Sequence, residues 1–326
     1  MKALITTVPF GDRNRQPLDA LKHAGVEYLI NPLGKKLKAP ELADMVSDFD
    51  VIIAGTEPIT DEVMAKGSNL KMISRVGIGL DSVDLMAAER RGITVSYTPD
   101  APAPAVAELT IGLMISLLRS VQVSNLHMHH RRWHRYFGRR IATSTIGIIG
   151  TGRIGKGVIR HLSGFNCQRI LVNDLHTKHD LGNNPVLEWC DKETIYKQAD
   201  IITLHVPLTA KTKNMVRREH LELMSSHAIL INTARGGIIN EQDLFDMLNR
   251  GHLGGASIDV FQDEPYTGPL CDVDRCLLTA HMGSMSEDCR TRMEIEATDE
   301  AIRFLKNEPL QGVVPEDEYA VQREGL

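Results

Sequence analysis

The stretch TIGIIGTGRIGKGVIRHLSGF, residues 145–165, decides the fold of this chain. It begins with β-branched residues typical of a buried strand and continues as an amphipathic helix. Between the two lies Gly150-Thr151-Gly152-Arg153-Ile154-Gly155, a GxGxxG pattern. The pattern alone is a weak signal, but a strand before it and a helix after it are the context in which dinucleotides bind. The alternative interpretation is a glycine-rich turn without a ligand.

Each glycine of the pattern has a physical task in binding a pyrophosphate. Gly150 permits a tight turn, Gly152 lets backbone amides approach the phosphates, and Gly155 allows close packing of helix and strand. The phosphates then lie at the positive end of the helix dipole. Asp174 ends the next strand, where its carboxylate can accept both ribose hydroxyls and would repel a 2′-phosphate. The sequence therefore predicts NAD rather than NADP, bound by Gly150, Gly152, Arg153, Ile154, Gly155 and Asp174.

Short β-branched runs alternate with helical patterns on both sides of this stretch. This alternation predicts α/β architecture, with parallel sheets covered on both faces. Prolines interrupt it at residues 98–105, where we expect a hinge between two lobes. One long helix is expected over 105–133, a last helix over 286–307, and a polar tail over 315–326. The expected strands are 2–8, 26–30, 50–54, 71–75, 93–97, 145–150, 169–173, 200–206, 227–232, 254–260 and 276–280.

Composition limits the class of protein. A chain of 326 residues exceeds one usual hydrophobic core, so we expect about two domains. A net charge of -5 disfavours general nucleic-acid binding, which needs a positive field. Apolar runs such as 109–118 are short of the roughly 18–20 residues that span a membrane, and the N-terminus has no signal-peptide pattern. Five cysteines without a CxxC pair favour a reducing cytoplasm.

Ordered motifs in the second half resemble the D-specific 2-hydroxyacid dehydrogenase family. They are INTARGGIINEQDLFDMLNRGHLGGASIDVFQDEP (231–265) and LLTAHMGSMSEDCRTRM (277–293). ISRVGIGLDSVDL (73–85) resembles that family's substrate loop, and AVAELTIGLM (105–114) the helix that opens its cofactor domain. The resemblance runs in order over nearly the whole chain.

The resemblance implies two doubly wound parallel-sheet domains. A Rossmann NAD domain over 101–284 would be inserted into a flavodoxin-like substrate domain made of 1–100 and 285–326. It also implies a homodimer joined through the NAD domains.

The family motifs assign three catalytic residues. Arg235 in TARGG would grip the carboxylate and carbonyl oxygen of a 2-oxo acid. His281 in TAHMGS would exchange a proton with the substrate oxygen, and Glu264 in DVFQDEP would favour its imidazolium form. Taken singly, the three residues also fit a salt-bridge arginine, a turn glutamate and a capping histidine.

The same resemblance extends the two binding sites. The loop at 75–79 would hold the substrate carboxylate on its backbone amides, although a simple turn is the alternative. The further cofactor residues are His205, Val206, Pro207, Thr233, Ala234, Asp259 and Gly283. The substrate-binding residues are Arg75, Val76 and Gly77, together with Arg235 and His281.

The basic segment HMHHRRWHRYFGRR, residues 127–140, allows several interpretations. Positions 127, 130 and 134 share a face if the helix continues, but no carboxylate or cysteine completes a metal site, and we expect no metal. A solvated dimer-interface arm with Trp133 as packing anchor is one interpretation. Another is an arm whose arginines reach a partner's cleft and attract an anionic substrate.

The sequence thus predicts an NAD-dependent D-2-hydroxyacid dehydrogenase for a small anionic acid. Glycerate, lactate, phosphoglycerate and other 2-hydroxy acids stay open as substrates. Glu57 in AGTEPIT would repel a phosphate if it faces the cleft. The alternative of another class is an NAD(H)-sensing corepressor of the same fold, which can retain the three catalytic residues.

Overall fold

The computed structural model describes residues 1–175, 181 and 185–323, which fall into two compact units. Unit 1 comprises Met1–Pro102 and Met285–Leu326, and unit 2 comprises Ala103–Ser284. The first boundary lies two residues after the expected one, at the point where helix α5 (Ala103–Leu118) begins. The second boundary lies where the sequence puts it.

Unit 1 contains a parallel sheet in the order β2-β1-β3-β4-β5, the flavodoxin-like arrangement. Side chains alternate between its two faces, so Ala3 and Ile5 of β1 pack into one core and Leu4 packs into the other. Every expected strand of this half is present, and each is a little shorter than its β-branched run. The strands are β1 (Lys2–Ile5), β2 (Glu27–Ile30), β3 (Val51–Ala54), β4 (Met72–Arg75) and β5 (Thr94–Tyr97).

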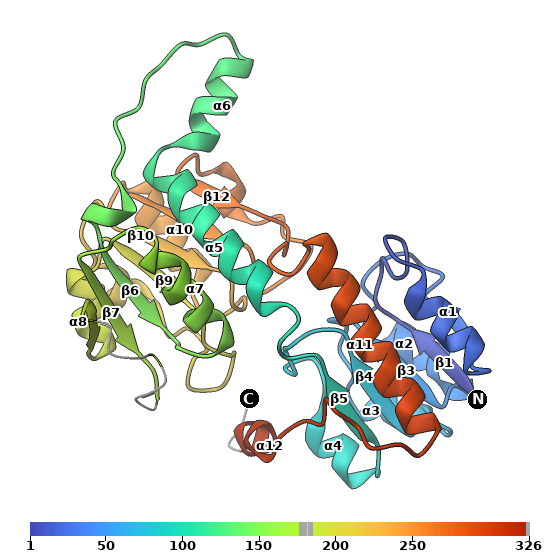
Figure 1. Ribbon diagram of the computed structural model, residues 1–326. Helices are drawn as coiled ribbons and strands as arrows, with labels where there is room; N and C mark the ends of the chain where they lie inside the picture. Colours follow the sequence, from blue (N-terminus) through green and yellow to red (C-terminus); the bar gives the residue numbers. More distant parts are fainter. Residues whose placement is uncertain (176–180, 182–184, 324–326) are drawn as a thin grey trace. The chain divides into compact units, whose positions relative to one another are not determined.

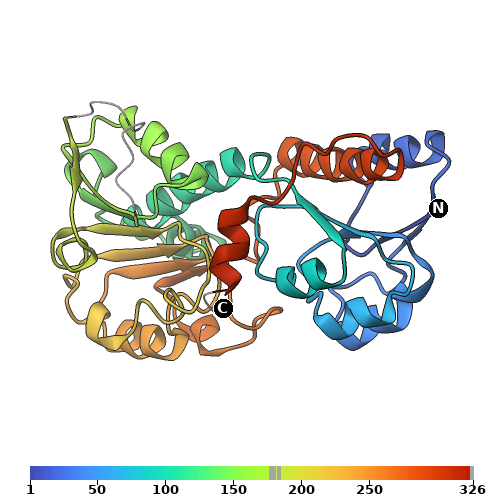
Figure 2. The same ribbon diagram turned by 90° about the horizontal axis from the view of Figure 1, so that it is seen from below.

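Helices cover both faces of this sheet (Figure 2). Helix α1 (Gln16–His23) and helix α11 (Glu287–Leu305) lie on one face, so the returning C-terminal segment completes unit 1. Three helices cover the other face: α2 (Ala39–Met45), α3 (Asp61–Lys66) and α4 (Leu85–Arg90). The polar tail forms a further helix, α12 (Glu316–Arg323), which the sequence pattern did not predict.

Unit 2 contains a seven-stranded parallel sheet in the order β12-β11-β10-β9-β6-β7-β8. This is the Rossmann order with one strand added, so the predicted fold class is confirmed. The sequence analysis predicted every strand of this sheet except the short outer strand β8. The strands are β6 (Thr145–Ile149), β7 (Arg169–Asn173), β8 (Leu187–Trp189), β9 (Ile201–Leu204), β10 (Ile229–Asn232), β11 (Gly255–Ile258) and β12 (Cys276–Leu278).

Two cores lie on the two faces of this sheet. Helix α5 and helix α7 (Arg153–Ser163) share one core. They pack so closely that a Cβ on Gly157 would lie 2.9 Å from Cβ of Ala107. The opposite core contains α8 (Lys192–Gln198), α9 (Arg218–Leu221) and α10 (Glu241–Asn249).

The expected single helix over 105–133 is wrong. It breaks after Leu118, and α6 (Val121–His129) follows across a bend of 65°. Ser120 takes a left-handed conformation at the break, with a φ of 50°. Of the helices described, none is by itself long and apolar enough to cross a membrane, and α5 and α6 pass that test only as a bent pair.

Residues 121–140, called the arm below, project from unit 2 (Figure 1). The helix ends before residue 130, so the helical face through 127, 130 and 134 does not form. No group of possible metal ligands occurs among the described residues. Trp133 is 77% exposed and is therefore not a packing anchor within the chain. Tyr136 is the better-packed aromatic residue, since its hydroxyl lies 2.9 Å from Nδ1 of His127.

Candidate active site

The glycine loop after β6 is held by close backbone contacts. Gly150 has a φ of 97°, and a Cβ there would lie 2.5 Å from the carbonyl oxygen of His205. A Cβ on Gly155 would lie 2.1 Å from the carbonyl oxygen of Gly150. At Gly152, by contrast, a Cβ would meet nothing within 4 Å. The turn is therefore tight on the protein side and open where a pyrophosphate would approach the start of α7.

Asp174 lies beside this loop at the end of β7. Its Oδ2 accepts hydrogen bonds from the Thr151 amide at 2.7 Å and from the Thr151 hydroxyl at 2.8 Å. Its Oδ1 accepts one from the Leu175 amide at 2.7 Å. The open glycine loop, the helix N-terminus and this carboxylate fit the phosphates and ribose of NAD. Contact of Asp174 with the ribose stays a prediction.

His205 supports the loop from the neighbouring strand β9. Its amide donates to the carbonyl oxygen of Ile149 at 2.7 Å, and its Nε2 lies 3.0 Å from the Thr203 hydroxyl. Its Nδ1 is buried and has no hydrogen-bond partner among the residues described. Burial lowers the pKa of His205 to about 3, so the imidazole is neutral. Val206 and Pro207 follow it, and direct cofactor contact by these residues stays a prediction.

The loop after β10 is fixed by Asn232, a residue that the sequence analysis missed. Its Oδ1 accepts from the Ala234 amide at 3.1 Å, and its Nδ2 donates to the carbonyl oxygen of Arg235 at 2.8 Å. Thr233 is buried with its hydroxyl 2.9 Å from that of Thr110. The guanidinium of Arg235 donates to the carbonyl oxygen of Ala234 at 2.7 Å. A polar residue that ends a buried strand is the signal that could have drawn attention to Asn232.

His281 and Glu264 form a pair. Nδ1 of His281 lies 3.0 Å from both carboxylate oxygens of Glu264. An ionised carboxylate only accepts hydrogen bonds, so Nδ1 carries the proton and Nε2 is available for a substrate. The side chains are partly buried, with 33% of His281 and 19% of Glu264 exposed. The motifs thus identified two residues that the fold does bring together.

Asp259 organises the loop that carries His281. Its Oδ1 accepts from the Thr279 hydroxyl at 2.6 Å and from the Met282 amide at 2.8 Å. Its Oδ2 accepts from the Gly283 amide at 2.9 Å. Its backbone oxygen accepts from the amide of His281, which has a left-handed φ of 51°. The residue predicted to lie near the nicotinamide thus has a structural task as well.

The loops after β10 and β11 touch at Gly236. A Cβ on this glycine would lie 1.9 Å from the carbonyl carbon of Phe261, so no larger residue fits. Glu241 joins the same loops by accepting from the Gln262 amide at 2.7 Å. Burial raises the pKa of Glu241, and the charges of Asp263 and Glu264 raise it further against the lowering effect of the Gln262 hydrogen bond. The loops bearing Arg235 and Glu264 are therefore mechanically connected.

The predicted substrate loop belongs to unit 1, and the structure contradicts an anion nest at the amides of Val76 and Gly77. The Val76 amide donates to the carbonyl oxygen of Ala54 at 2.8 Å, and the Gly77 amide donates to the Thr98 hydroxyl at 2.7 Å. Arg75 is buried, and its guanidinium donates to the carbonyl oxygen of Val76. These donors are used inside unit 1, so substrate contact by Arg75, Val76 and Gly77 stays a prediction without the nest to support it.

Comparison with known proteins identifies the family of the chain. Residues 111–283 match the family model described as D-isomer specific 2-hydroxyacid dehydrogenase, NAD binding domain. Hydroxypyruvate reductase of Thermotoga maritima is 34% identical over 88% of this chain and 96% of its own length. D-3-phosphoglycerate dehydrogenase of Methanocaldococcus jannaschii is 35% identical over 85% of this chain. The chain spans only 54% of that relative's length.

A solved structure of a Thermus thermophilus protein gives the same result for the fold. It is 32% identical, with a TM-score of 0.88 over 97% of this chain and 100% of that one. The site and the fold together define an NAD-binding oxidoreductase class. The chain belongs to the D-isomer specific 2-hydroxyacid dehydrogenase family, a class of NAD-dependent enzymes, and unit 2 is its NAD-binding domain. The predicted family and the predicted cofactor are confirmed.

Proposed function

We propose that this protein transfers a hydride between NAD(H) and C2 of a D-2-hydroxy acid or the corresponding 2-oxo acid. The observation that carries the proposal is the His281–Glu264 pair at 3.0 Å, whose geometry leaves Nε2 of His281 for the substrate oxygen. The loop with Arg235 follows β10, the next strand but one in the same sheet. The carboxyl ends of parallel strands are where open α/β sheets bind ligands.

His281, Glu264 and Arg235 each have one task in this reaction. In reduction, His281 donates a proton from Nε2 to the oxygen that develops negative charge, and in oxidation it takes that proton back. Glu264 accepts a hydrogen bond from Nδ1 of His281 and so holds the ring with Nε2 directed to the substrate oxygen. Arg235 binds the carboxylate and carbonyl oxygen of the substrate and orients C2. Bound NAD(H) supplies the hydride.

The experiment is NADH oxidation against a panel of 2-oxo acids. The panel contains glyoxylate, hydroxypyruvate, pyruvate and a phosphorylated 2-oxo acid. His281→Ala should lower kcat by about 10²–10⁴-fold while NADH binding is unchanged. His23→Ala, at an exposed position of α1, is the matched control and should keep wild-type activity. Absence of turnover with every acid, or full activity in His281→Ala, would contradict the proposal.

The alternative of an NAD(H)-sensing corepressor is not favoured, because the relatives reported above are named as enzymes. Glu57 does not decide between phosphorylated and unphosphorylated substrates. This residue is 2% exposed and accepts hydrogen bonds from the Thr6 hydroxyl and the Gly55 amide. Because Glu57 is turned into unit 1, the expected argument against a phosphorylated substrate does not hold.

We propose a homodimer formed through the arm. Helix α6 has no buried residue, and the arm exposes several large apolar side chains to solvent. An exposed apolar surface often marks an interaction site, and a second copy of the chain is the partner that we propose for it. The exposed residues are Val121, Leu126, Met128, Trp133 and Phe137. Leu126→Glu together with Trp133→Glu should shift the mass in light scattering from dimer to monomer, and a wild-type monomer would refute this proposal.

We also propose that the arm selects a doubly anionic substrate in the partner's cleft. Arg131, Arg132 and Arg135 are exposed, whereas Arg139 is tied to its own unit by Asp200 at 3.0 Å. Replacing the three exposed arginines by alanine should erase any preference for a phosphorylated acid over pyruvate and spare activity on monoacids. If the triple variant keeps the wild-type preference, the arm has a structural role and does not select the substrate.

We further propose a cytoplasmic location, because five free cysteines suit a reducing compartment.

A further inference from the structure

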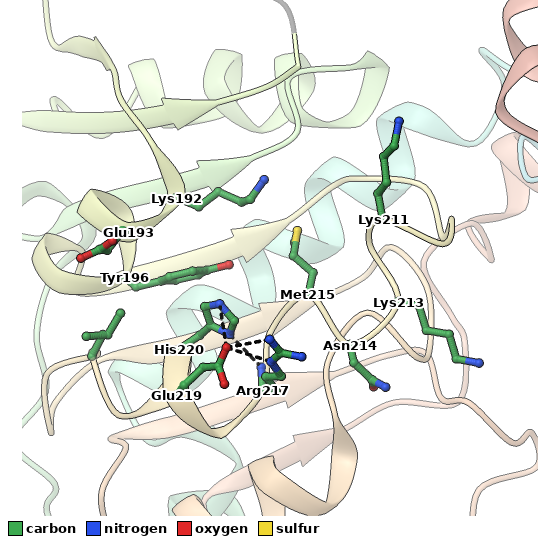
Figure 3. A pocket seen from close by; sticks show the side chains of 11 residues that line it. Lys192, Glu193, Tyr196, Lys211, Lys213, Asn214, Met215, Arg217, Glu219 and His220 are labelled. Atoms are coloured by element: carbon green, nitrogen blue, oxygen red, sulfur yellow. Dashed lines mark hydrogen bonds and ion pairs between the residues drawn. The ribbon is translucent and has the colours of Figure 1, made fainter. Parts of the chain in front are cut away.

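A pocket of about 580 Å³ lies in unit 2 between α8, α9 and the segment after β9 (Figure 3). Lys192, Lys211 and Lys213 line it, but their ammonium ends point away from one another. The hydroxyl of Tyr196 is buried and cannot be reached from the pocket. The lysines therefore form exposed surface and no converging site, whereas the C-terminal part of unit 1 joins segments that lie far apart in the sequence.

The C-terminal tail follows a fixed path in unit 1. Glu300 of α11 is 4% exposed, and its carboxylate accepts hydrogen bonds from the amides of Gln311 at 3.0 Å and Gly312 at 2.9 Å. The carbonyl oxygen of Gly312 accepts from the amide of Tyr97 in β5 at 2.9 Å. These contacts set the direction in which the chain enters α12.

Helix α12 packs on α4 (Figure 1). Tyr319 packs against the core that α2, α3 and α4 cover. The guanidinium of Arg323 lies 3.6 Å from the carboxylate of Glu89 in α4. The end of α12 is therefore held beside α4 by an apolar contact and an ion pair.

Gln322, in the last turn of α12, binds both the loop before α4 and the start of that helix. Its Nε2 donates to the carbonyl oxygens of Val83 at 2.8 Å and Leu80 at 3.2 Å. Its Oε1 accepts from the amide of Leu85, the first residue of α4, at 2.9 Å. A carboxamide has two donors and one acceptor oxygen, so this single side chain binds three backbone groups between residues 80 and 85.

Residues 76–84 join β4 to α4 and are called the substrate loop below. A second tie on this loop comes from Ile59, whose amide donates to the carbonyl oxygen of Ser82 at 2.7 Å and whose carbonyl oxygen accepts from the Asp84 amide at 3.0 Å. The loop begins at the carboxyl end of β4, the edge at which open α/β sheets bind ligands. The half-buried Gly79 directly precedes Leu80. The hydrogen bond from Gln322 to Leu80 therefore fixes the backbone next to the glycines of the loop.

We propose that Gln322 is a positioning residue for the substrate, because it holds the substrate loop in the conformation that receives the acid. The proposal rests on the proposed function and adds the C-terminal helix to the substrate side of the enzyme. Without the hydrogen bonds of Gln322, the loop would populate further conformations, and the apparent affinity would fall by the fraction of molecules that keep the competent one. The bound complex is the same in both cases, so KM for the acid should change and kcat should not.

The test compares Gln322→Met with the wild type in NADH oxidation, with the 2-oxo acid of the panel that the wild type reduces fastest. Methionine has the length of glutamine but cannot form these hydrogen bonds. We expect KM for the acid to rise about 5- to 30-fold, kcat to stay within about twofold and KM for NADH to be unchanged. Gln16→Met makes the same substitution at an exposed position of α1 and should leave all three at their wild-type values.

Hydrogen exchange followed by mass spectrometry reports on the loop without any substrate. In Gln322→Met, the peptide of residues 78–85 should exchange at least about fivefold faster, while the peptide of β4 keeps its wild-type rate. An unchanged KM for the acid would overturn the proposal, as would an equal rise in KM for the acid and for NADH, or unchanged exchange in the loop. If the wild type reduces no acid at all, the proposed function fails, and the exchange result alone decides whether Gln322 holds the loop.

Discussion

The carboxylate of Asp259 is the strongest single test of how the site is built. It is 1% exposed and accepts three hydrogen bonds, from the Thr279 hydroxyl and from the amides of Met282 and Gly283. Asp259→Asn keeps the shape but turns one acceptor oxygen into an NH₂ donor. Whichever way the amide is oriented, its NH₂ faces a backbone N–H that has lost its acceptor.

The size of the effect follows from these contacts. A hydrogen bond to a charged acceptor contributes about 1.5–3 kcal/mol, and a buried donor left unsatisfied adds its own desolvation cost. We therefore expect Asp259→Asn to lower the free energy of unfolding by about 2–4 kcal/mol. For a domain of this size, that corresponds to a fall in Tm of about 5–15 °C. His281 lies in the same loop in a left-handed conformation, and a displacement of about 1 Å would lower kcat about 100-fold.

The assay combines thermal unfolding by circular dichroism with steady-state NADH oxidation, including the KM for NADH. Asp263→Asn is the matched control, because it removes the same charge from an exposed position near Glu264. The control should keep the wild-type Tm and kcat. If Asp259→Asn unfolds at the wild-type temperature with wild-type kcat, the three hydrogen bonds do not position His281 and the reasoning fails.

Three further predictions concern Glu264, Asp174 and His205. Glu264→Gln should lower kcat, since an amide can turn its NH₂ toward Nδ1 of His281 and would then no longer hold the ring with Nε2 toward the substrate; an unchanged kcat would refute the pairing. The wild type should prefer NAD over NADP, and Asp174→Ala with Leu175→Arg should relax this preference; equal kcat/KM for both cofactors in the wild type would contradict it. In the folded protein His205 stays neutral down to about pH 3, whereas in the unfolded chain it takes up a proton near pH 6.5. As the pH falls below 6.5, protonation therefore stabilises the unfolded chain. The free energy of unfolding then falls by up to about 1.4 kcal/mol per pH unit. His205→Gln should therefore show a shallower fall in unfolding free energy between pH 6.5 and 4, and equal slopes would disprove the burial argument.

Most of the fold could be predicted because most of its strands, such as β3, β4, β9, β10 and β11, are buried on both faces. A strand such as β3 is a continuous apolar run between polar segments, and that pattern is visible without any partner. The outer strand β8 has only three residues, one half-buried and two exposed, so its pattern carries no such signal. The break at Ser120 follows no glycine or proline, and nothing local in the sequence distinguishes it from continuing helix.

The candidate site was predictable to the extent that it depends on strand order. In a Rossmann sheet, β10, β11 and β12 are neighbours, so the loops carrying Arg235, Glu264 and His281 must end at the same edge. The sequence cannot show which polar groups are used to hold those loops, because that depends on loops meeting in space. Gly236 against Phe261 is a contact of this kind, and the amides of Val76 and Gly77 are another, since both donate within unit 1.

The catalytic side chains could be predicted from the sequence and the hydrogen bonds of the substrate loop could not, and this difference has one physical cause. A motif specifies which side chains follow the strand ends, such as the imidazole of His281 and the carboxylate of Glu264, and the strand order then brings them together. A backbone amide has a single donor, and any nearby acceptor can use it. The Thr98 hydroxyl at 2.7 Å uses the one on Gly77, although the two glycines after β4 read as an open nest. Thr98→Val would remove that acceptor. If the Gly77 amide then remained protected from hydrogen exchange as in the wild type, the amide would have another partner and this account of the loop would be wrong.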